Sequence, residues 1–299
     1  MKAIVGIDPE QRYESALALL GRLQFTDLHL DLTHVFRPLS ATVTAEISCP
    51  EPGGYVPPDV LEQMEQSNKT RATEVLEQAL CKARRMDPHP TGTLMLGFPA
   101  PQLMSHADES HSDLVCVTAH RHSALECFVL GSVCRALVIG AHQSILIAKG
   151  RPEPLGDLKV VVATDHSPYS SRCVEKFLRF APAGLGEVTV LSVVEPENFI
   201  PMSPEAAKVM VEEEQKHWDE IVAKTNELRV RFEGIGSVAH SKVIMDDPAA
   251  QIAQTMRDTG ADLLVMGAQG HGFLERITVG SVSLHQVVSE SFPVLIIRT

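Results

Sequence analysis

The chain repeats itself once, and this duplication limits the folds it can adopt more than any other feature. Residues 2–8 (KAIVGID) correspond to residues 159–165 (KVVVATD). Three later pairs keep the same order: Asp113 with Asp262, Gly131 with Gly280, and Ile145 with Val294. At 299 residues the chain is long enough for two domains. We predict two copies of one domain, residues 1–150 and 157–299, joined by a linker rich in Pro and Gly.

Each half alternates short apolar segments with longer amphipathic ones. In the second half the segments expected to be strands are residues 159–164, 188–194, 241–245, 262–267 and 294–298. Asp247 followed by Pro248 marks a helix start, because Asp caps a helix and Pro fits its first turn. Strands that alternate with helices form right-handed crossovers and an open parallel sheet with helices on both faces. The expected fold class is therefore α/β, with two tandem five-stranded parallel sheets of Rossmann-like type.

A glycine pattern follows the fourth strand expected in the second half. Gly267 and Gly270 are followed after nine residues by Gly280, and Gly280 precedes a segment with helical periodicity. Glycine lets the backbone approach a phosphate, and the N–H groups at a helix start point at negative charge. We interpret this arrangement as a cradle for nucleotide phosphates. The alternative is that these glycines serve only the turn and the packing of the helix.

Two better-known phosphate motifs do not fit. The P-loop pattern G-x-x-x-x-G-K-[ST] does not occur, and residues 267–272 spell G-x-x-G-x-G rather than the dinucleotide order. The spacing G-x2-G-x9-G-[ST] near the C-terminus resembles instead the ATP-binding motif of universal stress proteins. The resemblance covers the whole chain, strongly in the second half and weakly in the first. It implies the family's fold and pairing of the last strands across a two-fold axis, so that the halves would pack as an intrachain pseudo-dimer.

The resemblance also implies a set of nucleotide contacts in the second half. The residues expected to bind the nucleotide are Asp165, Val193, Gly267, Gly270, Gly280, Ser281, Val282 and Ser283. Asp165 would contact the adenine, the backbone of Val193 would meet the base, and Ser281 and Ser283 would offer hydroxyls. The residue types alone leave alternatives open, namely Asp165 as a cap of the next helix and Val193 as a core valine.

In the first half the glycine positions have changed. Thr118 and Arg121 replace the first two glycines, while Asp8 and Gly131 remain. A β-branched and a long side chain both put atoms where the backbone should meet phosphate. We interpret the first half as a degenerate site on an intact fold. The competing interpretation is that Arg121 binds an anion directly.

The composition excludes several classes of function. A formal net charge of −12 disfavours binding to nucleic acid or to an anionic membrane, because phosphate groups would be repelled. The apolar start is too short for a signal peptide, and no apolar run approaches the ~18 residues of a membrane helix. Six cysteines without a C-x-x-C pair favour a cytoplasmic protein. The histidines at 106–111 and 120–122 lack zinc-type spacing, so no metal site is expected, and no catalytic residue is assigned.

Three functions remain in competition. The favoured one is an ATP-binding universal stress protein that acts as a nucleotide-dependent regulator in the stress response. ADP and AMP stay open as ligands, and Mg²⁺ would accompany the nucleotide. The second is a slow ATPase or self-phosphorylating enzyme, for which the intact site offers no evident general base or arginine finger. The third is an interaction scaffold without nucleotide; the protein partner and a further homodimer stay open.

Overall fold

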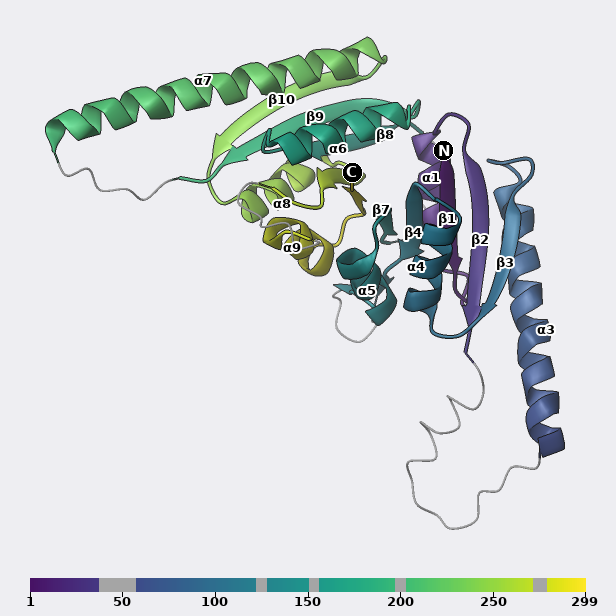
Figure 1. Cartoon of the computed structure of the whole chain (residues 1–299). Coiled ribbons are helices and arrows are strands. Elements are labelled where there is room, and N and C mark those ends of the chain that lie inside the picture. Colours follow the sequence, from purple (N-terminus) through teal and green to yellow (C-terminus); the bar gives the residue numbers. More distant parts are fainter. Residues whose placement is uncertain (38–57, 122–127, 151–155, 197–202, 271–278) are drawn as a thin grey trace. The chain divides into compact units, whose positions relative to one another are not determined.

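The chain forms two compact units of α/β structure (Figure 1). The computed structural model describes residues 1–37, 58–121, 128–150, 156–196, 203–270 and 279–299. Unit 1 comprises Met1–Gly21, Asp27–His120 and Leu130–Glu153, and unit 2 comprises Arg22–Thr26, Arg121–Val129 and Pro154–Thr299. In the described part of the chain, no helix combines the length and the apolar character needed to cross a membrane.

Unit 1 is built around a parallel sheet of five strands. Its elements are β1 (Lys2–Ile7), α1 (Glu14–Leu23), β2 (His29–Phe36), α3 (Pro58–Ala83), β3 (Thr91–Leu96), α4 (Pro99–Glu109), β4 (Leu114–Thr118), α5 (Ser132–Gly140) and β7 (Ser144–Ala148). The strands are ordered β7-β4-β1-β2-β3, and each neighbouring pair is parallel. Between β4 and α5 in the sequence, the two short strands β5 (His120–Arg121) and β6 (Phe128–Val129) pair with each other, and residues Arg121–Val129 are counted with unit 2.

Unit 2 repeats this architecture. Its elements are β8 (Leu158–Ala163), α6 (Pro168–Arg179), β9 (Leu185–Val194), α7 (Pro204–Gly234), β10 (Val238–Met245), α8 (Pro248–Thr259), β11 (Leu263–Gly267), α9 (Ser281–Ser289) and β12 (Val294–Ile297). The parallel strands are ordered β12-β11-β8-β9-β10. The prediction of two α/β halves with five parallel strands each is confirmed, while the domain boundaries and the pseudo-dimer packing stay predictions.

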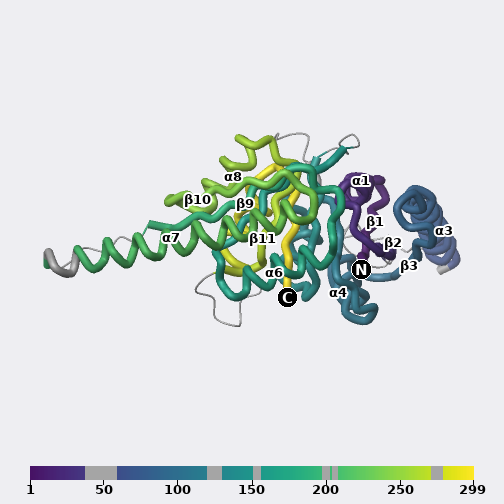
Figure 2. Tube along the Cα trace, turned by 90° about the horizontal axis from the view of Figure 1, so that it is seen from above, coloured from purple at the N-terminus to yellow at the C-terminus, as the bar shows by residue number. Residues whose placement is uncertain are grey.

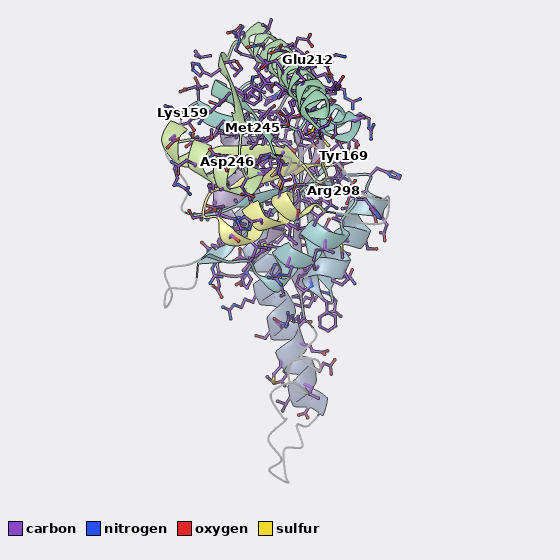
Figure 3. All side chains as sticks on the ribbon, turned by 90° about the vertical axis from the view of Figure 1, so that its left-hand side faces the viewer. Lys159, Tyr169, Glu212, Met245, Asp246 and Arg298 are labelled. Carbon is purple, nitrogen blue, oxygen red and sulfur yellow. The ribbon has the colours of Figure 1, made fainter. Side chains whose placement is uncertain are left out.

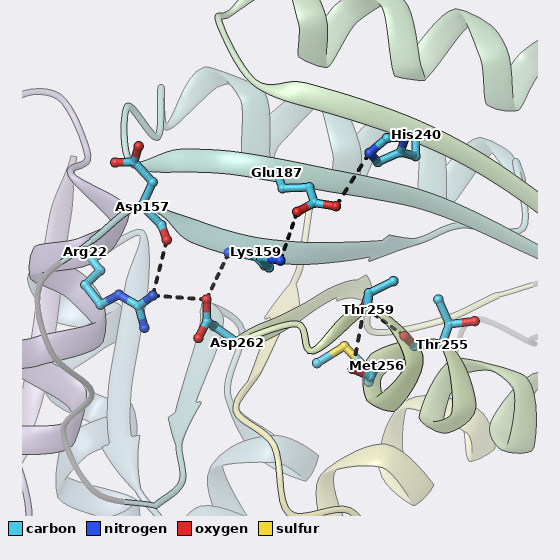
Figure 4. Close-up of polar contacts among 9 residues, drawn as sticks. All are labelled: Arg22, Asp157, Lys159, Glu187, His240, Thr255, Met256, Thr259 and Asp262. Atoms are coloured by element: carbon cyan, nitrogen blue, oxygen red, sulfur yellow. Dashed lines mark hydrogen bonds and ion pairs between the residues drawn. The ribbon is translucent and has the colours of Figure 1, made fainter.

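The repeated aspartate has the same role in both units. Asp113 Oδ2 accepts a hydrogen bond of 2.9 Å from the Lys2 backbone N–H. Asp262 Oδ2 accepts one of 2.9 Å from the Lys159 N–H (Figure 4). The backbone N–H of each aspartate bonds back to the carbonyl oxygen of the same lysine, at 2.9 and 2.8 Å. Asp113 therefore fixes the start of β4 beside the start of β1, and Asp262 fixes the start of β11 beside the start of β8. This shared role explains why the sequence repeats the aspartate.

Helices cover both faces of the unit 2 sheet. The α6 and α7 helices lie on one face, where the rings of Phe177 and Phe232 are 6.5 Å apart and fully buried. The α8 and α9 helices lie on the other, where Gln286 Nε2 donates to the Ala249 carbonyl oxygen at 2.8 Å. Right-handed crossovers produce this division, because the chain moves from β8 to β10 in one direction and then crosses to β11 and β12. The strand order therefore reverses between β8 and β11, which is where such sheets open a crevice at the strand C-termini.

The α7 helix is much longer than the strands it covers. Its 31 residues span about 46 Å, whereas the eight residues of β10 span about 26 Å. A crossover helix runs antiparallel to its strands, so its N-terminal turns extend past the strand C-termini. Figures 1 and 2 show this part of α7 running out beyond the strands of its own unit. The helix therefore adds a side wall above the C-terminal edge of the sheet.

Candidate functional site

A cavity of about 820 Å³ lies at the C-terminal ends of the unit 2 strands. It is lined by residues that follow β8 and β11, by the ends of β9 and β10, and by the starts of α8 and α9. The lining includes all eight residues expected from the sequence: Asp165, Val193, Gly267, Gly270, Gly280, Ser281, Val282 and Ser283. The structure therefore brings together residues that lie more than one hundred positions apart in the chain.

One end of the cavity is the N-terminus of α9. Gly280 is its N-cap residue and provides no side-chain cap, while the Leu284 N–H donates to the Gly280 carbonyl oxygen at 2.9 Å. The first amides of a helix have no acceptor within that helix. Those of Ser281, Val282 and Ser283 belong to this first turn. Together with the helix dipole they make this end of the cavity suited to an anion.

Ser283 differs from the expectation that its hydroxyl faces a ligand. Its Oγ donates a hydrogen bond of 2.8 Å to the Gly267 carbonyl oxygen, and the residue is only 4% exposed. This bond ties the end of β11 to the first turn of α9. The Ser283 hydroxyl is therefore engaged within the protein, whereas Ser281 is exposed at the helix start.

Both loop glycines lie in close contact with other parts of the protein. A Cβ placed on Gly270 would lie 2.7 Å from Asp165 Oδ2, a distance that real Cβ atoms do not adopt. A Cβ on Gly267 would lie 3.3 Å from the Gln269 carbonyl oxygen and 3.4 Å from Cys173 Sγ. Gly270 thus lets the loop pass directly against the Asp165 carboxylate.

Asp165 shapes the loop that follows β8 but does not cap the next helix. Its Oδ1 accepts a hydrogen bond of 3.0 Å from the Ser167 N–H. The N-cap of α6 is Ser167, whose Oγ accepts a bond of 3.1 Å from the Ser170 N–H. The alternative of Asp165 as the helix cap is therefore wrong, because the turn at Asp165 places Ser167 in that position.

A buried polar network holds this loop against β9 and α7. His166 has a left-handed φ of +56°, and its Nε2 lies 2.8 Å from Thr225 Oγ1 and 2.9 Å from Ser192 Oγ. Thr225 donates its own proton to the Ile221 carbonyl oxygen at 2.7 Å, so its Oγ1 acts as an acceptor for the other two. Thr225 and Ser192 are 0% and 1% exposed. Since unsatisfied buried polar groups are costly, these contacts fix the position of the loop that carries Asp165.

The backbone of Val193 faces the cavity side of β9. The Thr164 N–H donates to the Leu191 carbonyl oxygen, and the Asp246 N–H donates to that of Val194, both at 3.0 Å. Backbone groups of alternate strand residues point to the same edge, so those of Val193 point to the β8 side, like those of Leu191. The β8 strand ends opposite Leu191. Val193 therefore presents its N–H and C=O beyond the end of the neighbouring strand.

Besides the α9 N-terminus and the loop glycines, the cavity has apolar and acidic lining residues. Its apolar lining residues are Val193, Trp218, Ile221, Met245, Pro248 and Ile252. The acidic lining residues are Glu195, Glu213 and Glu214. Trp218, Glu213 and Glu214 could not be predicted as cavity residues from the sequence, because the pattern of a long helix does not reveal that it extends past its sheet.

The residues behind Gly267 form a protonated, buried layer. Burial raises the pKa of the Cys173 thiol to about 11. Cys173 Sγ donates to the Ile297 carbonyl oxygen at 3.3 Å. Burial also raises the pKa of Tyr169 and lowers that of Arg298, which lies near it (Figure 3). A thiol that stays protonated at neutral pH is a poor nucleophile, so Cys173 supports the loop rather than providing chemistry.

In unit 1 the residue equivalent to Asp165 is fully engaged by its own loop. Asp8 Oδ1 accepts hydrogen bonds from the Glu10 and Arg12 N–H groups, at 3.0 and 3.2 Å. Asp8 Oδ2 accepts one of 3.0 Å from the Tyr13 N–H. Both carboxylate oxygens thus stabilise the turn that leads into α1. This use supports the interpretation of a degenerate site in unit 1.

Thr118 stands at the position of Gly267 in the first half. In the alignment of the two first strands, Ala16 corresponds to Cys173, and Ala16 is fully buried. Alanine lacks the sulfur atom that lies 3.4 Å from a Cβ built on Gly267. Thr118 Oγ1 is buried and has no hydrogen-bond partner among the residues that the structure describes. Arg121 lies in β5, but its side chain lies outside the described residues, so anion binding by Arg121 stays a prediction.

Within the described ranges, no three side chains of His, Cys, Asp or Glu come together as metal ligands. The features of the site are therefore a cavity, a helix N-terminus, a glycine loop and a carboxylate. The helix N-terminus suits an anionic group, and the apolar lining suits an uncharged part of the same ligand.

Comparisons with known proteins give the same family for both halves. The model described as "Universal stress protein family" matches residues 1–149 and 158–298. A universal stress protein of Methanocaldococcus jannaschii is 28% identical over 140 residues, which are 47% of this chain and 81% of that protein. A solved universal stress protein of Archaeoglobus fulgidus has a TM-score of 0.65 at 15% identity, covering 99% of this chain and 98% of its own. A family protein of Arabidopsis thaliana solved with AMP bound is 18% identical, covering 50% of this chain and 92% of its own, with a TM-score of 0.35.

Proposed function

Because this chain belongs to the universal stress protein family, we propose that its unit 2 binds an adenine nucleotide. ATP is the expected ligand, with ADP and AMP as alternatives. The observation that carries the proposal is the meeting of Asp165, the glycine loop and the α9 N-terminus around one cavity. A helix N-terminus binds phosphate without a basic field, which suits a chain with a net charge of −12.

Each part of the cavity has one role in this proposal. The first amides of α9 and the Ser281 hydroxyl bind the phosphates, while Ser283 contributes its amide and keeps its hydroxyl bond to Gly267. Asp165 accepts a hydrogen bond from the adenosine, and the outward backbone groups of Val193 meet the edge of the base. Mg²⁺ would arrive with the triphosphate, and no protein ligand is assigned to it.

We propose a regulatory role rather than catalysis for this binding. Nucleotide occupancy would bias the conformation of unit 2, or its choice of protein partner, in a cytoplasmic stress response. A ligand shifts such an equilibrium by the difference in its affinity for the two states. Release of phosphate above the level of a non-binding variant would favour the slow ATPase instead.

The test is the shift in melting temperature that ATP produces in the full chain. A ligand at 100 times its Kd stabilises the native state by about 2.7 kcal/mol, which raises Tm by several degrees. The variant Gly270→Arg introduces the residue type of the equivalent position in the first half, Arg121. It should lose this shift in melting temperature, because its side chain collides with Asp165. The matched control is Gly234→Arg, where a Cβ has nothing within 4 Å. A wild-type chain that ATP does not stabilise, or an unchanged shift in Gly270→Arg, would contradict the proposal.

A further inference from the structure

Trp218 is the only tryptophan of the chain, and it lines the cavity from α7 while remaining partly exposed. A partly exposed indole on a helix surface is a large apolar group without a full covering. We propose that Trp218 is the surface against which the nucleobase stacks, so that α7 forms one wall of the base subsite. This inference rests on the proposed function and adds a specificity-determining residue to it.

The position of Trp218 follows from the anchor of α7 to the sheet. Thr225 faces the strand ends, where its Oγ1 contacts His166 and Ser192. Trp218 lies seven residues before Thr225 and therefore on the same helix face, about 10 Å nearer the helix N-terminus. That distance carries the indole past the end of β9 and over the cavity.

The surroundings of Trp218 suit a flat, uncharged ring. Val193, Met245 and Ile252 line the same cavity as Trp218, from β9, β10 and α8. A ring held between these side chains and the indole would be desolvated on both faces. Glu213 and Glu214 lie about one helical turn before Trp218 in α7 and also line the cavity. Their negative charges therefore repel phosphate groups from the surroundings of Trp218. The ligand is thereby oriented with its phosphates toward α9 and its base toward Trp218.

Unit 1 lacks this feature. Aligning Pro99 with Pro248 puts Lys69 at the position of Trp218, and Lys69 is exposed on α3. A flexible lysine gives a base no flat apolar surface. The difference agrees with the loss of the glycines at the other end of the unit 1 site.

The experiment compares ATP with inorganic triphosphate, which has the phosphates but no base. ATP should change the fluorescence of wild-type Trp218 until the site is saturated. By calorimetry, Trp218→Ala should weaken ATP binding about 10- to 100-fold and leave triphosphate binding unchanged, since stacking on an aromatic ring contributes about that factor. Trp218→Phe should recover most of the ATP affinity. The matched control Val230→Ala removes an exposed apolar side chain of α7 outside the cavity and should bind like wild type.

The possible failures can be told apart. Equal ATP affinity in Trp218→Ala and wild type would overturn the stacking role and leave the proposed function standing. An equal loss of ATP and triphosphate binding would also overturn the stacking role, because the loss of a contact with the base cannot weaken the binding of a ligand that has no base. A wild-type chain that binds neither ligand would overturn both proposals.

Discussion

The carboxylate of Asp165 lies directly against the backbone of Gly270, so that a Cβ on Gly270 would come within 2.7 Å of Asp165 Oδ2. Asp165 follows β8 and Gly270 follows β11, and these two strands are neighbours at the point where the strand order reverses. The contact joins the two loops that enclose the cavity. It also explains why the second half keeps a glycine at this position.

The first prediction concerns this contact. Gly270→Ala should displace the carboxylate and weaken ATP binding at least tenfold by calorimetry, because the Asp165 side chain must move away to make room for the methyl group. In an Asp165→Ala background the same substitution should cost much less, since the colliding group is gone. Two neighbouring residues coupled in this way give non-additive effects in a double-mutant cycle. Additive losses would show that Gly270 acts independently of Asp165.

The second prediction separates the two serines of α9. Ser283→Ala removes the bond to the Gly267 carbonyl oxygen and should lower the free energy of unfolding by about 1 kcal/mol. Ser281→Ala removes an exposed hydroxyl and should weaken ATP binding without a change in stability. Chemical denaturation and calorimetry on both variants check this. The reverse pattern would mean that the roles of the two hydroxyls are exchanged.

The third prediction concerns a buried pair in unit 1. His106 Nε2 lies 2.9 Å from Asp31 Oδ2, and Asp31 is only 4% exposed. His106→Ala should destabilise the chain by about 1–3 kcal/mol in chemical denaturation, because it leaves a buried carboxylate without this partner. The control is His142→Ala, whose contact with Asp108 is exposed and should contribute within about 0.5 kcal/mol. Equal effects of the two variants would contradict the structural role of the buried pair.

The fourth prediction concerns the cysteines that the structure describes. Burial raises the pKa values of Cys134 and Cys173 to about 11, and it also raises that of Cys116. At pH 8 a thiol with such a pKa is thiolate in about one molecule in a thousand, and this fraction rises about tenfold per pH unit up to the pKa. Cys81 is exposed on α3 and should be alkylated first. Peptide mapping after brief alkylation checks the order, and early labelling of Cys173 would contradict it.

The parts of this site that consist of residues close together in the sequence could be predicted from the sequence. A strand followed by glycines and a helix start is recognisable from adjacent residues, so Gly267, Gly270 and Gly280 could be predicted as one site within a parallel α/β fold. Asp165 and Val193 needed the family resemblance, because an aspartate in a turn and a valine in a strand have no distinctive pattern. The direction in which the Val193 backbone points follows from strand register, which the sequence does not contain.

Other features depend on tertiary geometry and were missed or misplaced. The strand expected at residues 241–245 begins at Val238, because an edge strand with exposed residues lacks a continuous apolar signal. The sequence did not predict Trp218 as a cavity residue, because only the length of α7 relative to β10 carries it over the cavity. Ser283 lines the cavity as expected, but its hydroxyl donates to the Gly267 carbonyl oxygen instead of facing a ligand.

The most direct test of the account is the stoichiometry of ATP binding to the full chain, measured by calorimetry. We predict one ATP per chain, bound in unit 2, because in the first half of the sequence Asp8 is engaged by its own loop and Thr118 and Arg121 replace the glycines. Gly270→Arg should then reduce the stoichiometry to zero. Two sites per chain would contradict the degenerate site in unit 1, and no binding by the wild type would contradict the nucleotide site itself.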